Sequence, residues 1–495
     1  MFSDSPKKIK TCRGDRMNKK AISLIMAAAL CFGLTACSES AGGGDNSESD
    51  RTSETVIDGK EFETNERFIS IADVPPVNFD KLDDYVALGF SGYILTEDGV
   101  KLTNNGTMTD AYKNAAAAVK KAGLDVYIRN QYNDPDYFQN EDGDTLRNKF
   151  VAGYSYKIPV RNLTTEFKDL GVSGFYMADE PVYDNLSEYG KLIGWYNEYY
   201  SDTYFHMNLF PSYAKADNFS RHSFVDYVQA YVDEIAAKVK GKKSICVDNY
   251  PFQTTEAIRS SYFGDLIITA TATKKYNETA DEKDRTNFGL CIQTFFDGGL
   301  TDIRSKADVS FQICTGIAMG AKVYEYFCYG SGQGMYGIMT SAGEKRVYDY
   351  VKDGNAYLSF EKVVNSFEWQ GVNAVAAENE KNRENVDSFD TLAEFALRDM
   401  GKLDVSKTGS RLDSLIGIYK KGDKDGYMVV NCSLPSSGKG AEGRANTVDL
   451  SIKNSKQALV YRIKDGVLVS SVEKIVDGTL RINLGAGDGA FVIPA

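Results

Sequence analysis

Between residues 63 and 367 the chain repeats one unit, which is a short apolar segment, a loop, and a segment with helical periodicity. Eight apolar segments have the length of strands, and they lie at 68–72, 87–95, 124–129, 172–178, 203–209, 244–248, 288–294 and 322–327. Apolar residues at helical spacing lie at 111–122, 186–199, 224–240, 307–319 and 344–367. Alternating strands and helices form parallel sheets, so eight units over about 300 residues predict an α/β fold, the (β/α)8 TIM barrel. The rival fold is an open doubly wound sheet, but no glycine-rich nucleotide turn follows the first strand.

The pattern changes after residue 367. Short segments of alternating polarity, separated by Gly, Asp and Ser turns, lie at 415–420, 427–432, 447–452, 458–463, 467–472 and 480–484. Alternation with a period of two is typical of half-buried strands, and closely spaced turns favour antiparallel pairing. Residues 368–495 are therefore predicted to form a C-terminal antiparallel β-sandwich domain.

The N-terminal region reads as an export signal. Met17-Asn18-Lys19-Lys20 is positively charged, residues 21–34 are apolar, and small residues precede Cys37. This order describes a secretory signal over 17–36, and the alternative is a membrane anchor helix. Leu34-Thr35-Ala36-Cys37 resembles the bacterial lipoprotein box, which implies a lipid on Cys37 and attachment to a cell surface or to the periplasmic side of a membrane. Residues 1–16 are interpreted as an upstream misread start, and the Gly/Ser/acidic segment 37–62 as a flexible tether.

Composition excludes several kinds of chemistry. The formal net charge of −12 argues against nucleic acid as a partner. Only His206 and His222 are present, which argues against a Ser-His-Asp triad and against a multi-histidine zinc site. Catalysis is therefore expected to use carboxylates, Tyr or Lys, with no cofactor and no metal. The five cysteines after Cys37 are scattered and predict buried thiols, and they are Cys246, Cys291, Cys314, Cys328 and Cys432.

The fourth predicted strand ends in two adjacent acids. Asp179 and Glu180 precede Pro181, which cannot donate a ladder hydrogen bond and so ends the strand. In a barrel, active residues lie at the carboxyl ends of the strands. Because neighbouring side chains on a strand point to opposite sides, only one of the two acids is expected to point directly into the pocket. A carboxyl group in an apolar cleft can act as a general acid, whereas the alternative is that the pair caps the following helix.

Other strand ends carry amides, acids and rings. The residues predicted to bind substrate there are Arg129, Gln131, Asn249, Tyr250, Gln293 and Tyr326. The further candidate acids are Asp248 after the sixth strand, Asp297 after the seventh and Glu325 on the eighth. Aromatic faces with polar side chains between them suit a sugar ring, although each ring taken alone is also consistent with core packing.

Several short motifs resemble barrel glycoside hydrolases, especially the family 42 β-galactosidase group and its uncharacterised relatives. They are Asp179-Glu180-Pro181, the segment 248–252 (DNYPF), the segment 312–329 (QICTGIAMGAKVYEYFCY) and the closing segment 485–491 (GAGDGAF). The resemblance implies that Glu180 is the acid/base. The residue before this glutamate is usually Asn in the family, and it is Asp179 here.

The resemblance also implies a nucleophilic glutamate at the end of the seventh strand, where this chain has Gln293-Thr294. A glutamine cannot act as a carboxylate nucleophile. Three explanations stay open: another acid (Asp297, Glu325 or Asp248) takes the role, the barrel only binds glycans, or the predicted strand register is shifted.

The sequence thus predicts a surface-anchored glycoside hydrolase that acts on an oligo- or polysaccharide. Glu180 would be the general acid, Asp179 a supporting or alternative acid, and Asp248 or Glu325 the second carboxylate. The alternatives are a non-catalytic carbohydrate-binding lipoprotein and a structural surface protein.

Overall fold

A computed structural model describes residues 55–56, 66–76, 81–96, 108–129, 166–199, 201–252, 256–295, 303–330, 336–340, 342–384, 386–433 and 444–495. The predicted signal 17–36, Cys37, Gln131 and Asp297 lie outside these residues. None of the helices in the described part of the chain combines the length and apolarity that crossing a bilayer requires.

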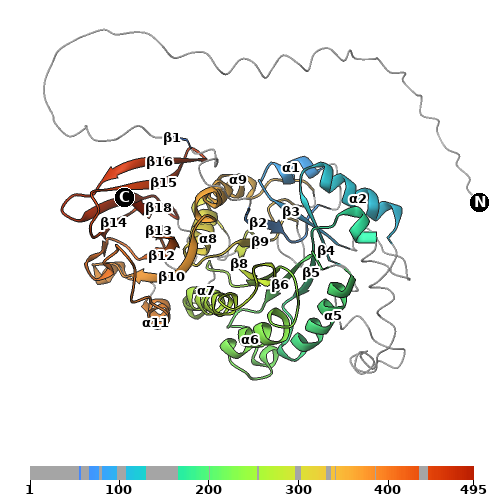
Figure 1. Cartoon of the computed structure of the whole chain (residues 1–495). Helices are drawn as coiled ribbons and strands as arrows, with labels where there is room; N and C mark the ends of the chain where they lie inside the picture. The colour runs from blue at the N-terminus through green and yellow to red at the C-terminus, as the bar shows by residue number, and fades with distance from the viewer. Residues whose placement is uncertain are drawn as a thin grey trace, which may run out of the picture. The chain divides into compact units, whose positions relative to one another are not determined.

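Eight parallel strands form one sheet, as predicted, and are drawn around a common centre in Figure 1. The strands are β2 (Ile69–Ala72), β3 (Gly92–Leu95), β4 (Asp125–Ile128), β5 (Gly174–Asp179), β6 (Tyr204–Leu209), β7 (Lys243–Val247), β8 (Thr286–Gln293) and β9 (Val323–Phe327). Their order in the sheet is β2-β9-β8-β7-β6-β5-β4-β3, so the strands from β3 to β9 each pair with their neighbours in sequence, β2 pairs with β9, and β2 and β3 are the two ends of the sheet. The (β/α)8 architecture predicted from the repeat is therefore confirmed.

The seam between β2 and β3 is closed by hydrogen bonds that involve side chains. The Ser91 N–H donates to the Ser70 carbonyl at 3.0 Å. Further along the two strands, the buried Tyr85 hydroxyl accepts from the Ala72 N–H at 3.2 Å and donates to the Gly92 carbonyl at 2.8 Å. A tyrosine hydroxyl thus replaces a direct ladder bond between the two strands and satisfies both backbone groups.

Helices follow most barrel strands. They are α1 (Leu82–Val86), α2 (Asp110–Lys121), α5 (Leu186–Tyr199), α6 (Phe224–Tyr231), α7 (Glu256–Asn277), α8 (Lys306–Ala318), α9 (Tyr348–Gly354) and α10 (Glu361–Val364). The structure differs from the prediction in several places, and helices α1 and α7 were not predicted. The predicted helix 224–240 continues from α6 as a π-helical turn at Val232–Ala236, the predicted helix 344–367 is split by a 3-10 segment, and β3 begins at Gly92 rather than at 87.

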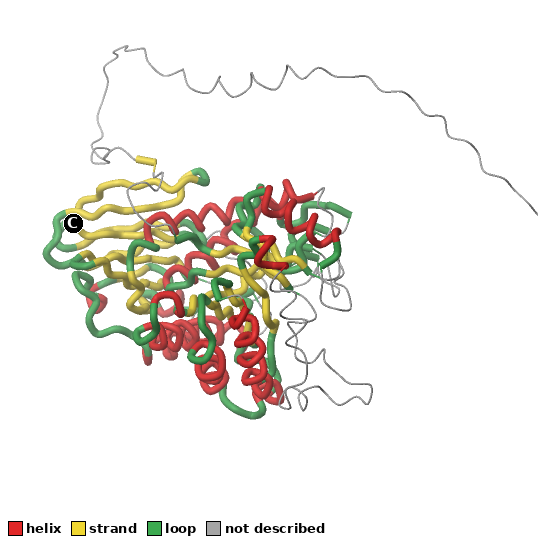
Figure 2. The backbone as a smooth tube through the Cα atoms, turned by 45° about the vertical axis from the view of Figure 1, so that its right-hand side comes forward, coloured by secondary structure: helices red, strands yellow, loops and turns green. Residues whose placement is uncertain are grey.

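The C-terminal part is an antiparallel β-sandwich, as predicted. Its strands, visible side by side in Figure 2, are β10 (Glu368–Val375), β11 (Gly409–Ser410), β12 (Ser414–Lys421), β13 (Lys424–Asn431), β14 (Asn446–Ser451), β15 (Gln457–Lys464), β16 (Val467–Lys474), β17 (Thr479–Leu484) and β18 (Gly489–Pro494). Together with a short strand at Thr55–Val56, these nine strands form a seven-stranded and a three-stranded sheet around a common apolar core.

One short strand belongs to the segment that the sequence predicts as a tether. Thr55–Val56 forms β1, which pairs antiparallel with Val469 and Ser470 of β16. The prediction of a tether over 37–62 is therefore wrong at these two residues, because their backbone groups pair with the edge of the larger sheet.

Candidate active site

A bulge in β5 decides which acid faces the barrel interior. The pairing of β5 with β6 shifts register between Tyr176 and Ala178. Met177 and Ala178 both belong to the apolar cluster that includes the helices, so Asp179 returns to the same side as Tyr176. The Tyr176 hydroxyl accordingly lies 3.3 Å from Oδ1 of Asp179. Bulges commonly re-aim a side chain next to an active site, and this one points Asp179 inward.

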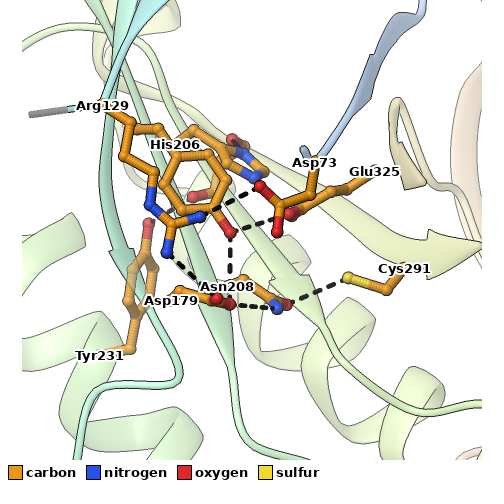
Figure 3. Close-up of polar contacts among 10 residues, drawn as sticks. Asp73, Arg129, Asp179, His206, Asn208, Tyr231, Cys291 and Glu325 are labelled. Carbon is orange, nitrogen blue, oxygen red and sulfur yellow. Dashed lines mark hydrogen bonds and ion pairs between the residues drawn. The ribbon is translucent and has the colours of Figure 1, made fainter. Parts of the chain in front are cut away.

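Arg129, directly after β4, links two acids across the barrel mouth (Figure 3). Its guanidinium lies 3.1 Å from Oδ1 of Asp73 and 3.3 Å from Oδ2 of Asp179. The guanidinium also stacks over the Tyr176 ring, 4.6 Å from its centroid. The Asn208 amide donates to Oδ1 of Asp179 at 3.1 Å. Asp179 thus accepts hydrogen bonds from a charged and a neutral donor, which fix the position of its carboxyl group.

Asp73, the residue after β2, is a member of this site that the sequence reasoning missed. Burial raises its pKa to about 6, and the negative charges of Asp179 and Glu325 act in the same direction, while Arg129 opposes them. The available signal was its position, because it directly follows the first barrel strand just as Asp179 ends the fourth.

Glu180 follows in a strained conformation. Its φ is +50°, a left-handed value that is rare for a residue other than glycine, and its N–H donates to the Asn208 carbonyl at 2.9 Å. The side chain is half-buried. Burial, together with the charge of Asp179, raises the pKa of the Glu180 carboxyl to about 7. A residue held in this conformation with a carboxyl group that retains its proton near neutral pH has the properties of a general acid.

Asp248, directly after β7, lies near Glu180. Its Oδ1 atom is buried and has no hydrogen-bond partner among the residues that the structure describes, while Tyr250 bonds the carboxyl group. Burial raises the pKa of Asp248 well above its usual value, and the charge of Glu180 contributes in the same direction. Asp248 thus joins Asp73 and Glu180 as a carboxyl group with a raised pKa at this end of the barrel.

Glu325 lies deeper than predicted. It is in the middle of β9, 2% exposed, and both of its oxygens are occupied. Oε1 accepts from the Tyr176 hydroxyl at 2.8 Å, and Oε2 lies 2.8 Å from Nε2 of His206. The other ring nitrogen of His206 lies 2.6 Å from Oγ of Ser244. Glu325 is thus enclosed inside the barrel, and its predicted place at the mouth is wrong.

His206 is the second site residue that the sequence reasoning missed, since the scarcity of histidine was used only to argue against a triad and a multi-histidine zinc site. His206 and Asn208 occupy alternate positions in the otherwise apolar strand β6. Polar residues at a spacing of two in a buried strand point to one face, and this spacing was a usable signal for the barrel interior. Among the described residues, the cluster that can hold a metal ion is His206, Cys246 and Glu325.

Three residues predicted to bind substrate have other roles. Asn249 is buried and donates from Nδ2 to Ser261 and Asp265 at 2.9 and 2.7 Å. Gln293 is also buried, and its Oε1 accepts from the N–H of Phe252 at 3.1 Å.

The third, Tyr326, points away from the barrel interior, where it packs edge-on against Phe90 and donates to Oδ1 of Asn355 at 2.7 Å. These three side chains satisfy buried polar groups rather than face the mouth, whereas Tyr250 does lie beside Asp248.

No protein-family model matches this chain, and no curated protein matches it. Solved structures do show a likeness. The chain is similar to a GH30 endoxylanase from Clostridium papyrosolvens C71, with 13% identity over 88% of this chain and 97% of that one and a TM-score of 0.45. It is also similar to a GH27 β-L-arabinopyranosidase from Geobacillus stearothermophilus, with 9% identity over 88% and 98% of the two chains and a TM-score of 0.46. At these scores the likeness does not decide the activity, which is argued from the site itself.

Proposed function

We propose that this protein is a glycoside hydrolase that acts on an oligo- or polysaccharide. The observation that carries the proposal is the pair of unlike carboxyl groups at the end of β5. Asp179 is held by Arg129 and Asn208, whereas burial and the charge of Asp179 raise the pKa of Glu180 to about 7. A carboxyl group that serves as proton donor, beside a second carboxyl group held by a cation, is an arrangement suited to cleaving a glycosidic bond.

In the proposed reaction Glu180 donates its proton to the glycosidic oxygen as the bond to the anomeric carbon breaks and a carboxylate oxygen of Asp179 bonds that carbon. Water then gives a proton back to Glu180 and displaces Asp179 from the anomeric carbon, which releases the sugar and restores both acids. The carboxylate of Asp179 faces the positive charge that develops on the sugar ring, and Arg129 and Asn208 fix its orientation. Arg129 also binds Asp73, so three strand ends are coupled in one arrangement. Preorganised charges of this kind stabilise a transition state because they need no reorganisation when the charge appears.

The sequence resemblance to the family 42 group supports the same role for Glu180. Its second requirement, a glutamate at the end of the seventh strand, is not met, since Gln293 is there and is engaged by the backbone of Phe252. Asp179 takes that role in our proposal, because it is the carboxylate that the bulge turns toward the barrel interior.

Reducing-sugar release from a panel of oligo- and polysaccharides tests the proposal. Wild type and Glu278→Gln, an exposed control far from the mouth, should show turnover, and Glu180→Gln should lose about 10²–10⁴-fold in kcat. Asp179→Asn should lose activity on every substrate that the wild type cleaves. If turnover is unchanged in Glu180→Gln, the proposed role of this residue is wrong.

The competing function is a binding protein without turnover. The observation in its favour is Gln293, a neutral side chain where the resemblance implies a nucleophile. This function predicts measurable affinity for a glycan in calorimetry and no released sugar at any pH, whereas hydrolysis by the wild type excludes it.

We also propose that Cys37 carries a lipid that attaches the protein to the outer or periplasmic side of a bacterial membrane. The Leu34-Thr35-Ala36-Cys37 motif after an apolar signal supports this proposal. Metabolic labelling with a tagged fatty acid should label the wild type and not Cys37→Ala, with Cys12→Ala as the matched control. Equal labelling of wild type and Cys37→Ala would overturn it.

A further inference from the structure

The interior of the barrel, below the proposed catalytic pair, contains three side chains with metal-ligating atoms of different kinds. They are His206 on β6, Cys246 on β7 and Glu325 on β9, and their nitrogen, sulfur and oxygen atoms all lie within 4.8 Å of one another. All three side chains are buried, with 0%, 0% and 2% exposure. Three strands of the barrel, β6, β7 and β9, thus bring one ligand atom each toward a common centre.

The distances among these three ligand atoms suit a small metal ion. Zinc binds nitrogen, sulfur and carboxylate oxygen at about 2.0–2.3 Å, so ligand atoms around it lie roughly 3.3–3.8 Å apart. Nε2 of His206 and Oε2 of Glu325 are 2.8 Å apart and need to separate by only a few tenths of an ångström. A mixed set of nitrogen, sulfur and oxygen favours zinc over magnesium or calcium, which prefer oxygen alone.

The second layer of contacts orients the three ligands. Nδ1 of His206 lies 2.6 Å from Oγ of Ser244, which leaves Nε2 as the ring atom that faces Glu325. The hydroxyl of Tyr176 bonds Oε1 of Glu325 at 2.8 Å and leaves Oε2 for the shared centre. Metal-binding histidines and carboxylates are typically held by such outer hydrogen bonds.

The thiol of Cys246 takes no part in the hydrogen bonds that orient His206 and Glu325. It is a free, fully buried cysteine, and it has no hydrogen-bond partner in the part of the chain that the structure describes. The neighbouring thiol of Cys291, by contrast, donates to Oδ1 of Asn208 at 3.4 Å (Figure 3). The two cysteines are therefore a matched pair in which one thiol is engaged and the other faces the candidate ligands.

Charge in this region also favours a cation. The carboxyl groups of Asp73, Asp179 and Glu325 act on one another, and Arg129 is the guanidinium that the structure describes beside them. Buried carboxylates require compensation by a proton, a cationic side chain or a metal ion. A divalent ion beneath Tyr176 would supply that compensation from the interior of the barrel.

We infer that His206, Cys246 and Glu325 form a three-ligand site for a zinc ion inside the barrel, with Ser244 and Tyr176 as outer partners. The site is distinct from the proposed catalytic pair, because it lies below Tyr176 and involves neither Asp179 nor Glu180. Zinc binds the thiolate form of cysteine, so zinc binding would release the proton of the Cys246 thiol. Zinc would stabilise the barrel and fix Glu325, and through it Tyr176.

The metal content of the full-length protein tests this inference directly. After expression with zinc and removal of loosely bound metal, elemental analysis should find about one zinc per chain in the wild type and in Cys291→Ser. Cys246→Ser and His206→Ala should retain at most a small fraction of it. Retained circular dichroism shows that a variant is folded, and equal zinc in the folded variants and the wild type would overturn the inference.

Cobalt(II) provides a second, spectroscopic readout of the same site. Protein reconstituted with cobalt should show the thiolate-to-cobalt charge-transfer absorption in the near ultraviolet, and this band should persist in Cys291→Ser and disappear in Cys246→Ser. If the wild type binds no cobalt, or binds it without this band, then Cys246 is not a ligand and the three side chains are a hydrogen-bonded cluster only.

Discussion

At the scale of single residues, the backbone where β5 pairs with β6 decides where the side chains of Asp179 and Glu180 lie. The bulge after Tyr176 turns Asp179 toward Arg129, and the left-handed conformation of Glu180 leaves its carboxyl group in a half-buried position beside that charge. The two acids are neighbours in sequence and have opposite environments in space. This contrast lets us assign Glu180 as the proton donor and Asp179 as the second carboxylate.

The pH dependence of activity follows from Glu180. The acid must be protonated to act, and its pKa is raised from its ordinary value of 4.5 to about 7. The value of kcat/KM should therefore fall as the pH rises through about 7, close to tenfold per pH unit beyond it. A pH profile of the wild type should show this decrease, and Glu180→Gln should lack it. A profile whose decrease begins near pH 5 would contradict the assignment.

Arg129 should be sensitive even to a conservative substitution. Its guanidinium reaches Asp73 and Asp179 at once, whereas the single ammonium of Lys cannot hold both in the same geometry. Hydrogen bonds to charged groups contribute about 1.5–3 kcal/mol, so Arg129→Lys should lower kcat/KM roughly 10- to 100-fold. Arg346→Lys, at an exposed residue paired with Glu344, is the matched control and should leave kcat/KM unchanged.

Sequence reasoning located the pair but not its orientation. Pro181 and the apolar strand before it place Asp179 and Glu180 at a strand end, which is local information. The bulge depends on how β5 pairs with β6, and alternation along one strand does not reveal it. For the same reason the contact between Asp73 and Arg129, which are 56 residues apart, could not be predicted.

At the scale of elements, buried strands were predictable because their apolar runs are short and bounded by turns. Helix α7 was missed, since its segment from Ile267 to Thr273 (IITATAT) is rich in β-branched residues that favour strands. The structure accommodates them in a helix, where the hydroxyls of Thr269 and Thr273 bond the carbonyls of Asp265 and Thr269. Tertiary packing thus overrides the local propensity.

The seam of the barrel gives a stability prediction. Tyr85→Phe removes the hydroxyl that bonds Ala72 and Gly92 and leaves both buried backbone groups without this partner. Denaturant unfolding should show a loss of about 1–3 kcal/mol in the free energy of unfolding. Tyr262→Phe is the matched control, because the Tyr262 hydroxyl is buried without a partner in the described structure. Its substitution should be neutral or stabilising, and equal losses in both variants would contradict the role of Tyr85.

At the scale of the whole molecule, the barrel and the sandwich share helix α8. All twelve residues Ala307–Ala318 are buried. The Trp369 indole donates to the carbonyl of Ala318 at 2.9 Å, and the Tyr419 hydroxyl bonds that of Ile317. The sandwich thus completes the core around α8 and satisfies carbonyls at its C-terminal end. The sequence predicted the barrel from its repeat and the sandwich from its alternating segments. That the two domains share α8 could not be predicted, because it depends on contacts between them.

Gly417 of β12 is one point where the sandwich approaches α8 closely. A β-carbon there would overlap the backbone of Ala318 at the end of α8. Gly417→Ala should therefore lower the free energy of unfolding by about 1–3 kcal/mol, as overpacking does. Gly194→Ala in α5 has open space around it and should be neutral or slightly stabilising. A neutral Gly417→Ala would show that the sandwich does not pack tightly on α8.

The central claim is that Glu180 supplies the proton for glycosidic cleavage. The most direct test compares kcat/KM of Glu180→Gln with that of the wild type on two substrates. Both carry the same sugar, one with an activated aryl leaving group that needs no proton and one with a poor leaving group. We predict that kcat/KM falls about 10²–10⁴-fold for the poor leaving group and stays within about tenfold of the wild type for the activated one. Equal losses on both substrates, or no loss on either, would contradict the assignment of Glu180 as the general acid.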